Sequence, residues 1–201
     1  MPKSDIKVLH VVPAVALALF AHATPRADVV TDWKVVATET VFAAGLPPPP
    51  ANRTMAIVQT AVYEGVNAIT KRYPADRMAL NATPEASIDA AVTAANRAAL
   101  TALVPSQRAA IDAAAQKALN GIPDGPAKDA GIAVGEQAAK AAIEMCADDG
   151  AAAPERYRPV TTAGAYVPTV VPAVPQWPQR RPWVLATPDQ FRPGAAACPQ
   201  R

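Results

Sequence analysis

Small apolar side chains, with few aromatic ones among them, limit most strongly how this chain can fold. Hydrophobic residues make up 51% of the 201 residues, whereas aromatic residues make up only 5%. Alanine favours helices, while strands favour β-branched and aromatic side chains. A chain of this length corresponds to about one domain. We therefore expect an all-α fold of closely packed helices.

Apolar residues recur at helical spacing in five segments of the chain, which predict about five helices between residues 24 and 150. The first is capped by Thr31 or Asp32 and stops at Gly45; its apolar face comprises Trp33, Val36, Thr40 and Ala44. The second starts at Pro50 and ends before Tyr73. Its stripe is the clearest and contains Met55, Val58, Val62, Val66 and Ile69.

The third helix is expected to open at Thr83-Pro84-Glu85, a capping residue followed by proline and an acid. Its predicted buried stripe is Ile88, Val92, Ala95, Ala99 and Leu103, beside a polar edge of Asp89, Thr93, Arg97 and Thr101. The fourth carries Ile111, Ala115, Ala118 and Leu119 and closes at Asn120-Gly121. The fifth spans residues 126–148 with Ile132, Gly135, Ala139, Ile143 and Cys146 on one side. Small residues on these faces should bring the helix backbones close together.

Residues 1–23 have the pattern of a signal peptide. Lys3 and Lys7 precede an apolar run at residues 8–20, and Ala21-His22-Ala23 forms a cleavage site. The alternative is an uncleaved interfacial anchor, because the run is too short to span a membrane. We expect export to the periplasm or the medium. Both histidines lie in this segment (His10 and His22), so residues 24–201 offer no imidazole as base or metal ligand.

Residues 151–201 differ in composition from the helical part, since they hold 10 of the 22 prolines and lose helical periodicity. Such a segment either wraps the bundle in extended form with its rings inserted or stays mobile. We expect wrapping, because the segment contains several large rings: Tyr157, Tyr166, Trp177, Trp183 and Phe191. Residues 175–180 (PQWPQR) also match a polyproline-groove ligand, a match that we attribute to chance in an exported protein.

Charge and motif content exclude several functions. Nineteen basic residues balance 17 acidic ones without a basic cluster, which argues against nucleic-acid binding, and no apolar stretch is long enough to span a membrane. Phosphate loops, metal-ligand spacings and nucleophile elbows are missing from the sequence.

Four helical carboxylates are expected on solvated faces: Glu39, Glu64, Glu136 and Glu144. Cys146 and Cys198 could pair in an oxidising compartment, a question that two cysteines leave open.

Three segments, with two shorter ones after them, resemble the beginning of secreted vanadium-dependent haloperoxidases, which share a superfamily with type 2 phosphatidic acid phosphatases. The three are residues 27–33 (ADVVTDW), 61–69 (AVYEGVNAI, similar to the family's A-x-Y-D-A-V-N-A-I helix) and 122–132 (IPDGPAKDAGI). The shorter ones are residues 181–183 (RPW) and 189–194 (DQFRPG). The resemblance implies that this chain is the N-terminal half of a larger all-helical fold, whose full-length members bind vanadate.

The sequence departs from that family where the chemistry resides. The family holds vanadate or phosphate with Lys…Arg-Pro, Pro-Ser-Gly-His and Ser-Arg…His segments, all in its C-terminal half. Here Arg158, Arg181 and Arg192 precede prolines but lack the upstream lysine, and Pro105-Ser106 continues as Gln107-Arg108. The chain also ends soon after residues 189–194, which we interpret as a premature end. No catalytic, cofactor-binding or metal-ligating residue can therefore be assigned, and no cofactor is expected in this chain.

Two functional hypotheses follow. In the first, the chain is the exported N-terminal helical part of a haloperoxidase-like or acid-phosphatase-like protein, inactive alone. In the second, it is a free-standing periplasmic helical module that binds a partner through its Pro/Trp-rich tail. A half-bundle should also expose the apolar face meant for its missing half, so the first hypothesis predicts self-association.

Overall fold

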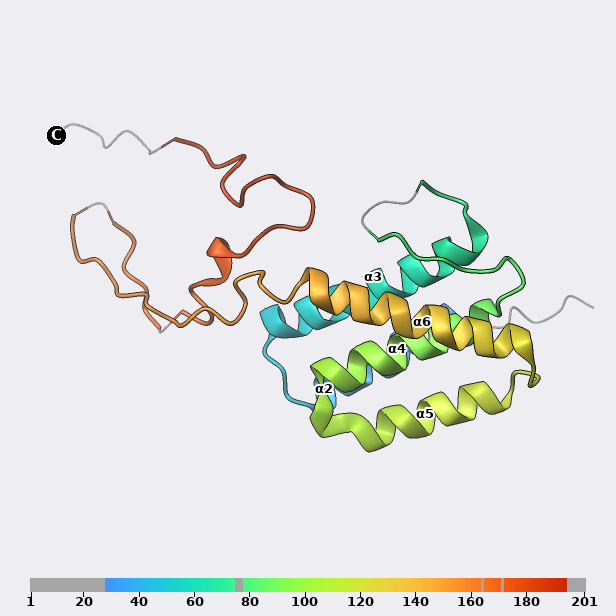
Figure 1. Ribbon diagram of the computed structural model, residues 1–201. Helices are drawn as coiled ribbons and strands as arrows, with labels where there is room; N and C mark the ends of the chain where they lie inside the picture. Colours follow the sequence, from blue (N-terminus) through green and yellow to red (C-terminus); the bar gives the residue numbers. More distant parts are fainter. Residues whose placement is uncertain (1–27, 75–77, 164, 171, 195–201) are drawn as a thin grey trace, which may run out of the picture.

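The computed structural model describes residues 28–74, 78–163, 165–170 and 172–194, and within them the chain is all-helical without a strand. The expected signal peptide lies outside the described residues. Five α-helices and two short 3-10 helices, labelled η, make up the described secondary structure (Figure 1). They are α2 (Val29–Ala43), α3 (Pro48–Thr70), α4 (Ile88–Leu103), η1 (Pro105–Gln107), α5 (Arg108–Asn120), α6 (Pro126–Met145) and η2 (Trp177–Gln179). The predicted all-α fold is confirmed.

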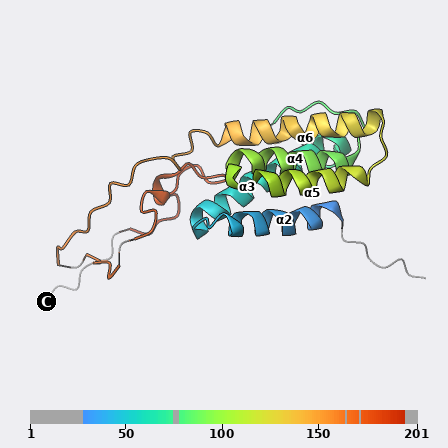
Figure 2. The same ribbon diagram turned by 90° about the horizontal axis from the view of Figure 1, so that it is seen from below.

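Helix α4 forms the centre of the bundle and contacts α2, α3, α5 and α6. Figure 2 shows α6 and α2 on opposite sides of α4. The largest fully buried apolar side chains come from α3, α4 and α5, namely Ile57, Val58, Val92, Leu100 and Ile111. The described helices therefore enclose a core of their own.

Two glycines of α6 allow the backbones of α4 and α6 to touch. A Cβ atom at Gly135 would lie 2.3 Å from the Ala91 carbonyl oxygen, and one at Gly131 would lie 2.3 Å from the Ser87 carbonyl oxygen. Neither distance is compatible with a side chain. The sequence-based expectation that small residues bring these helices together is thus confirmed.

The ends of three helices differ from the prediction. Helix α2 is capped by Asp28, whose carboxylate accepts a hydrogen bond from the Thr31 amide at 2.8 Å, and not by Thr31 or Asp32. Helix α3 begins at Pro48, two residues before Pro50. Helix α6 ends at Met145, three residues before Asp148. Several residues at each end can start or stop a helix, so local propensity did not decide among them.

The start of α4 is also later than predicted, because contact with α6 fixes it. Thr83 forms a turn, in which its carbonyl accepts a hydrogen bond from the Ala86 amide at 3.1 Å. Ser87 is the N-cap, and its own amide donates to the Ala127 carbonyl at the beginning of α6. Ile88 is consequently 39% exposed, although it was expected in the buried stripe.

Most residues of the stripes predicted for α2, α4 and α6 are buried or half-buried, but each helix also buries residues beside its stripe. On α4, Thr93 is fully buried, and its hydroxyl oxygen accepts a hydrogen bond from the Trp33 indole at 3.2 Å. The predicted polar edge is therefore partly core. On α6 the buried face has smaller residues at its centre, Val134, Ala138 and Ala142, while the predicted Ile132 and Ile143 are half-buried. On α2 the fully buried residue is Ala37.

The Pro-rich segment leaves the end of α6 and extends past the bundle, as the orange and red trace in Figure 1 shows. Tyr166 is 79% exposed and Phe191 is 77% exposed, so these rings are not inserted into the bundle. Trp183 is the exception, since it packs against the core formed by the helices. The expected wrapping is wrong for most of the segment and holds only around Trp183.

Candidate functional site

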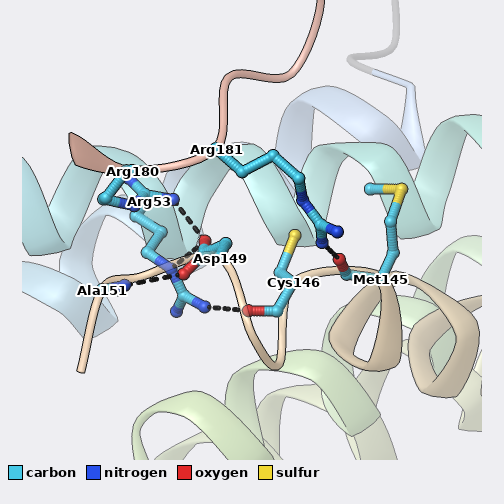
Figure 3. Close-up of polar contacts among 7 residues, drawn as sticks. All are labelled: Arg53, Met145, Cys146, Asp149, Ala151, Arg180 and Arg181. Carbon is cyan, nitrogen blue, oxygen red and sulfur yellow. Dashed lines mark hydrogen bonds and ion pairs between the residues drawn. The ribbon is translucent and has the colours of Figure 1, made fainter. Parts of the chain in front are cut away.

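The most elaborate polar arrangement in the described chain surrounds Asp149, four residues after the end of α6. The Asp149 residue is only 3% exposed. Its Oδ2 atom accepts a hydrogen bond from Arg53 Nε at 2.8 Å and a second from Arg180, and its Oδ1 atom accepts one from the Ala151 amide at 2.9 Å (Figure 3). One buried carboxylate thus joins α3, the end of α6 and the Pro-rich segment.

Further bonds tie the same elements together. Arg53 also donates to the Cys146 carbonyl at 2.8 Å, and the Arg181 guanidinium donates to the Met145 carbonyl (Figure 3). These acceptors lie at the C-terminal end of α6, where helix carbonyls lack partners within the helix. We refer to Arg53, Cys146, Asp149, Arg180 and Arg181 as the Asp149 cluster.

The cluster closes a loop at its base. The Arg181 amide donates to the Asp149 carbonyl at 2.9 Å, and Arg180 pairs with the Asp149 side chain. Residues 150–180 therefore leave from and return to the same point, and we call them the 150–180 loop. The Arg180 guanidinium also lies over the Trp177 ring, 4.5 Å from its centroid. This contact holds η2 against the base of the loop.

The charges of the cluster perturb its ionisable groups. Burial alone would raise the pKa of Asp149, but the hydrogen bonds from Arg53, the Ala151 amide and Arg180 outweigh it, so the pKa lies below its ordinary value. Burial raises the pKa of the Cys146 thiol, and the nearby Asp149 charge raises it further against the opposing arginines. A buried thiol of this kind is protonated and unreactive at neutral pH.

Acid should open the base of the loop. A carboxylate whose pKa is lowered by folding stabilises the fold above its unfolded pKa, and this contribution is lost as the pH falls through the folded pKa. We expect an acid transition below pH ~4 in the fluorescence of Trp177 and Trp183, measured during a titration. The Asp149→Asn variant should lack this transition. An identical transition in that variant would assign it to another carboxylate.

Glu64 is the one predicted surface carboxylate that the structure buries. The residue is 5% exposed, while Glu39, Glu136 and Glu144 lie on solvated faces as expected. Glu64 lines a cleft of about 310 Å³ at the end of α3, together with Asn67, Lys71, Tyr73 and others. Asn67 closes this end of the helix, since its side chain accepts from the Tyr73 amide at 2.9 Å and donates to the Tyr73 carbonyl at 3.1 Å.

The three arginines that precede prolines do not come together in the structure. Arg158 is exposed and donates to the carbonyl of its neighbour Tyr157, Arg181 donates to the Met145 carbonyl, and Arg192 is exposed. These three arginines thus have separate environments, whereas an oxyanion site needs converging cationic donors. The described residues also contain no group of three His, Cys, Asp or Glu side chains placed to hold a metal ion.

The structure also locates the PQWPQR match and one of the two cysteines. The arginine of the PQWPQR match is Arg180, which pairs with Asp149 inside the molecule and is therefore not available to a polyproline-binding domain. Cys146 is buried, whereas Cys198 lies outside the described residues, so their pairing stays a prediction. None of the helices in the described ranges is long and apolar enough to cross a membrane.

Sequence reasoning did not find the Asp149 cluster. Arg53 and Arg180 lie 96 and 31 residues from Asp149, and no local spacing links such distant positions. The nearest signal was an acidic pair, Asp148-Asp149, followed by Gly150 immediately after a helix. This signal indicates a turn but gives no partner.

The polar groups of the Asp149 cluster form hydrogen bonds and ion pairs with one another. The Asp149 carboxylate is bonded on both oxygens, and the thiol beside it is buried. This arrangement positions the 150–180 loop and exposes no nucleophile or base.

A scan against protein-family models and searches of curated proteins and of solved structures find no match for this chain.

Proposed function

We propose that this chain is the N-terminal helical part of an exported protein that resembles vanadium haloperoxidases and acid phosphatases. The parent reaction would be peroxide-dependent halide oxidation at bound vanadate, or phosphate ester hydrolysis in the same oxyanion pocket. The chain supplies a helical scaffold to that protein. Its own residues 24–201 contain no histidine, so the acid–base group of the reaction has to come from elsewhere.

The observation that supports this proposal is the position of the resembling segments in the bundle. In residues 27–33, Asp28 caps α2 and Trp33 is buried. In residues 61–69, Ala61, Val62 and Ile69 belong to the buried face of α3, and Gly65 faces Ala138 of α6. The resembling residues thus contribute mainly to packing, as expected for the scaffold part of an enzyme.

The third resembling segment has the same character. In residues 122–132, Lys128 joins the turn before α6, since its ammonium donates to Asp124 at 2.8 Å and to the Ile122 carbonyl at 3.2 Å. Gly125 has a φ of +147°, which other residues rarely adopt, and Gly131 contacts the start of α4. These features fix how α5 connects to α6.

The nucleotide sequence that follows the coding region tests the proposal directly. A continuation, in frame or frameshifted, that encodes a Pro-Ser-Gly-His segment would support it. A downstream region without such a segment would contradict it. Export is tested separately by N-terminal sequencing of the secreted protein, which should begin at Thr24; a start at Met1 or Pro2 would contradict cleavage.

The purified chain should not oxidise halide on its own. With vanadate, peroxide and bromide, we expect an indicator dye to be brominated no faster than in buffer, and an aryl phosphate to remain intact. Surface cations attract an oxyanion only weakly, about 0–1 kcal/mol per pair, and the chain beyond residue 23 has no imidazole to move the proton. Turnover that survives repurification and disappears on heat unfolding would contradict the proposal.

A second candidate is a free-standing periplasmic helical module that acts through its Pro/Trp-rich tail. The observation in its favour is the exposure of large apolar side chains on that tail, such as Tyr166, Val184 and Phe191. A downstream region without Pro-Ser-Gly-His, together with a stable and cooperatively folded chain, would favour this candidate over the first.

A further inference from the structure

One peptide bond of the 150–180 loop is open to a protease that recognises arginine. Residues 151–194 contain five arginines and no lysine, and three of the arginines precede a proline: Arg158, Arg181 and Arg192. Proteases cut poorly before proline, because its ring fixes the backbone and its nitrogen carries no proton. Arg180 is paired with Asp149, and its side chain is only 12% exposed. Arg156, by contrast, is exposed and precedes Tyr157, so neither form of protection applies to it.

The backbone around the Arg156–Tyr157 bond has the form that proteases bind. A protease takes up its substrate as an extended segment. Residues 153–161 adopt no helix or strand, and in the described chain the backbone of residues 154–161 forms no hydrogen bond with another part of the backbone. The loop also projects beyond the end of the bundle in both views (Figures 1 and 2). Cleavage at this bond therefore requires no helix to unfold.

The same pair of residues occurs a second time, at Arg72-Tyr73 after α3, and there the backbone is held. The Tyr73 amide donates to the Asn67 side chain at 2.9 Å, and the Tyr73 carbonyl accepts from the same side chain at 3.1 Å. The Lys71 amide donates to the Asn67 carbonyl at 2.7 Å, and the Arg72 guanidinium lies over the Tyr73 ring. An extended conformation at the Arg72–Tyr73 bond thus requires the end of α3 to open first.

From this contrast we propose that Arg156–Tyr157 is a proteolytic processing site, at which a protease of arginine specificity converts the chain into two fragments. The protease adds one water across the peptide bond. The bond between the Arg156 carbonyl carbon and the Tyr157 nitrogen breaks, which leaves a carboxylate on Arg156 and an ammonium group on Tyr157. This inference does not rest on the proposed function, since either candidate could be processed in this way.

The Asp149 cluster keeps the two fragments together after the cut. The ion pair between Arg180 and Asp149 joins the C-terminal fragment to the helices, and so does the bond from the Arg181 amide to the Asp149 carbonyl. Trp183, which also belongs to the C-terminal fragment, packs against the core of the bundle. Cleavage therefore frees the loop at one end without releasing it.

Limited digestion of the purified chain with trypsin tests the cleavage. Mass spectrometry of timed samples should show the fragment that begins at Tyr157 forming at least about tenfold faster than one that begins at Tyr73. Arg156→Gln should abolish the first fragment. Arg158→Gln is the matched control, because this neighbouring arginine is also exposed but precedes a proline, and it should leave the rate unchanged. Comparable rates at the two Arg–Tyr bonds would overturn the proposal.

Gel filtration of the digested protein tests whether the cluster retains the tail. The two fragments of the wild type should elute together, whereas those of Asp149→Asn should separate. Asp148→Asn is the control, since this carboxylate is exposed, and its fragments should stay together. Circular dichroism before digestion should show the same helical content in all three proteins. Separate elution of the wild-type fragments would contradict retention by the cluster.

The protein recovered from its own cells and their medium tests whether the site is used. N-terminal sequencing should find a second chain that begins at Tyr157, and the mass of the other fragment should end at Arg156. A single chain that is intact across this bond would overturn the assignment of a processing site.

Discussion

Gly135→Ala should destabilise the bundle by about 3 kcal/mol, the upper end of the usual cost of overpacking. The new Cβ atom would lie 2.3 Å from the Ala91 carbonyl oxygen and 2.9 Å from both the Ala94 Cβ atom and the Ala95 amide nitrogen. Two of these three neighbours are backbone atoms of the central helix, which cannot rotate away. Helices α4 and α6 would have to separate, and the loss of packing exceeds the roughly 1 kcal/mol that alanine gains over glycine in a helix.

Urea unfolding followed by circular dichroism measures this loss. Gly65→Ala is the matched control, because Gly65 also lies inside a helix at the α3–α6 contact but its Cβ would meet Ala138 at an ordinary 3.5 Å. We expect Gly65→Ala to be as stable as the wild type or slightly more stable. Equal destabilisation by both substitutions would show that glycine flexibility, and not the α4–α6 approach, determines the effect.

Asp149→Asn should detach the base of the 150–180 loop. The substitution leaves the guanidinium groups of Arg53 and Arg180, whose side chains are 18% and 12% exposed, without their carboxylate. Breaking a buried ion pair by removing one partner costs about 3 kcal/mol or more. Because each 1.4 kcal/mol corresponds to a factor of ten, the opened state should become roughly 100 times more populated.

The thiol of Cys146 reports this opening, since the residue is 3% exposed and lines a small cavity with Arg181, Pro182 and Trp183. In a Cys198→Ser background, labelling by a thiol reagent should accelerate roughly 100-fold in Asp149→Asn. Asp148→Asn is the control, because this neighbouring carboxylate is exposed and should leave the rate unchanged. Unchanged labelling in Asp149→Asn would mean that Trp183 covers the thiol without help from the cluster.

The fold class and the approximate positions of the helices were predictable from the sequence. Apolar residues repeat at helical spacing, and the stripe of α3 from Met55 to Ile69 lies on buried or half-buried positions as expected. Glycines and prolines also marked the approximate interruptions between the helices. These signals are local, because a helix and its caps form among residues that are close in sequence.

The helix ends and the full extent of the buried faces were less predictable. Ser87 starts α4 because the beginning of α6 contacts it, and the buried face of α6 has Ala138 at its centre because α4 comes so close there. A hydrophobicity pattern favours the larger Ile132 and Ile143. Close approach of backbones selects the smallest side chains instead, so the tertiary contact overrides the pattern.

The sequence by itself determined that this protein is a bundle of helices followed by a Pro-rich segment, and that residues 24–201 contain no imidazole. Only the tertiary structure decided that Asp149 is a buried anchor and that Glu64 is not a solvated carboxylate. It also decided that most of the Pro-rich segment lies away from the helices. Composition and periodicity describe neighbours along the chain, whereas the environment of a charge depends on residues such as Arg53 that lie 96 positions away.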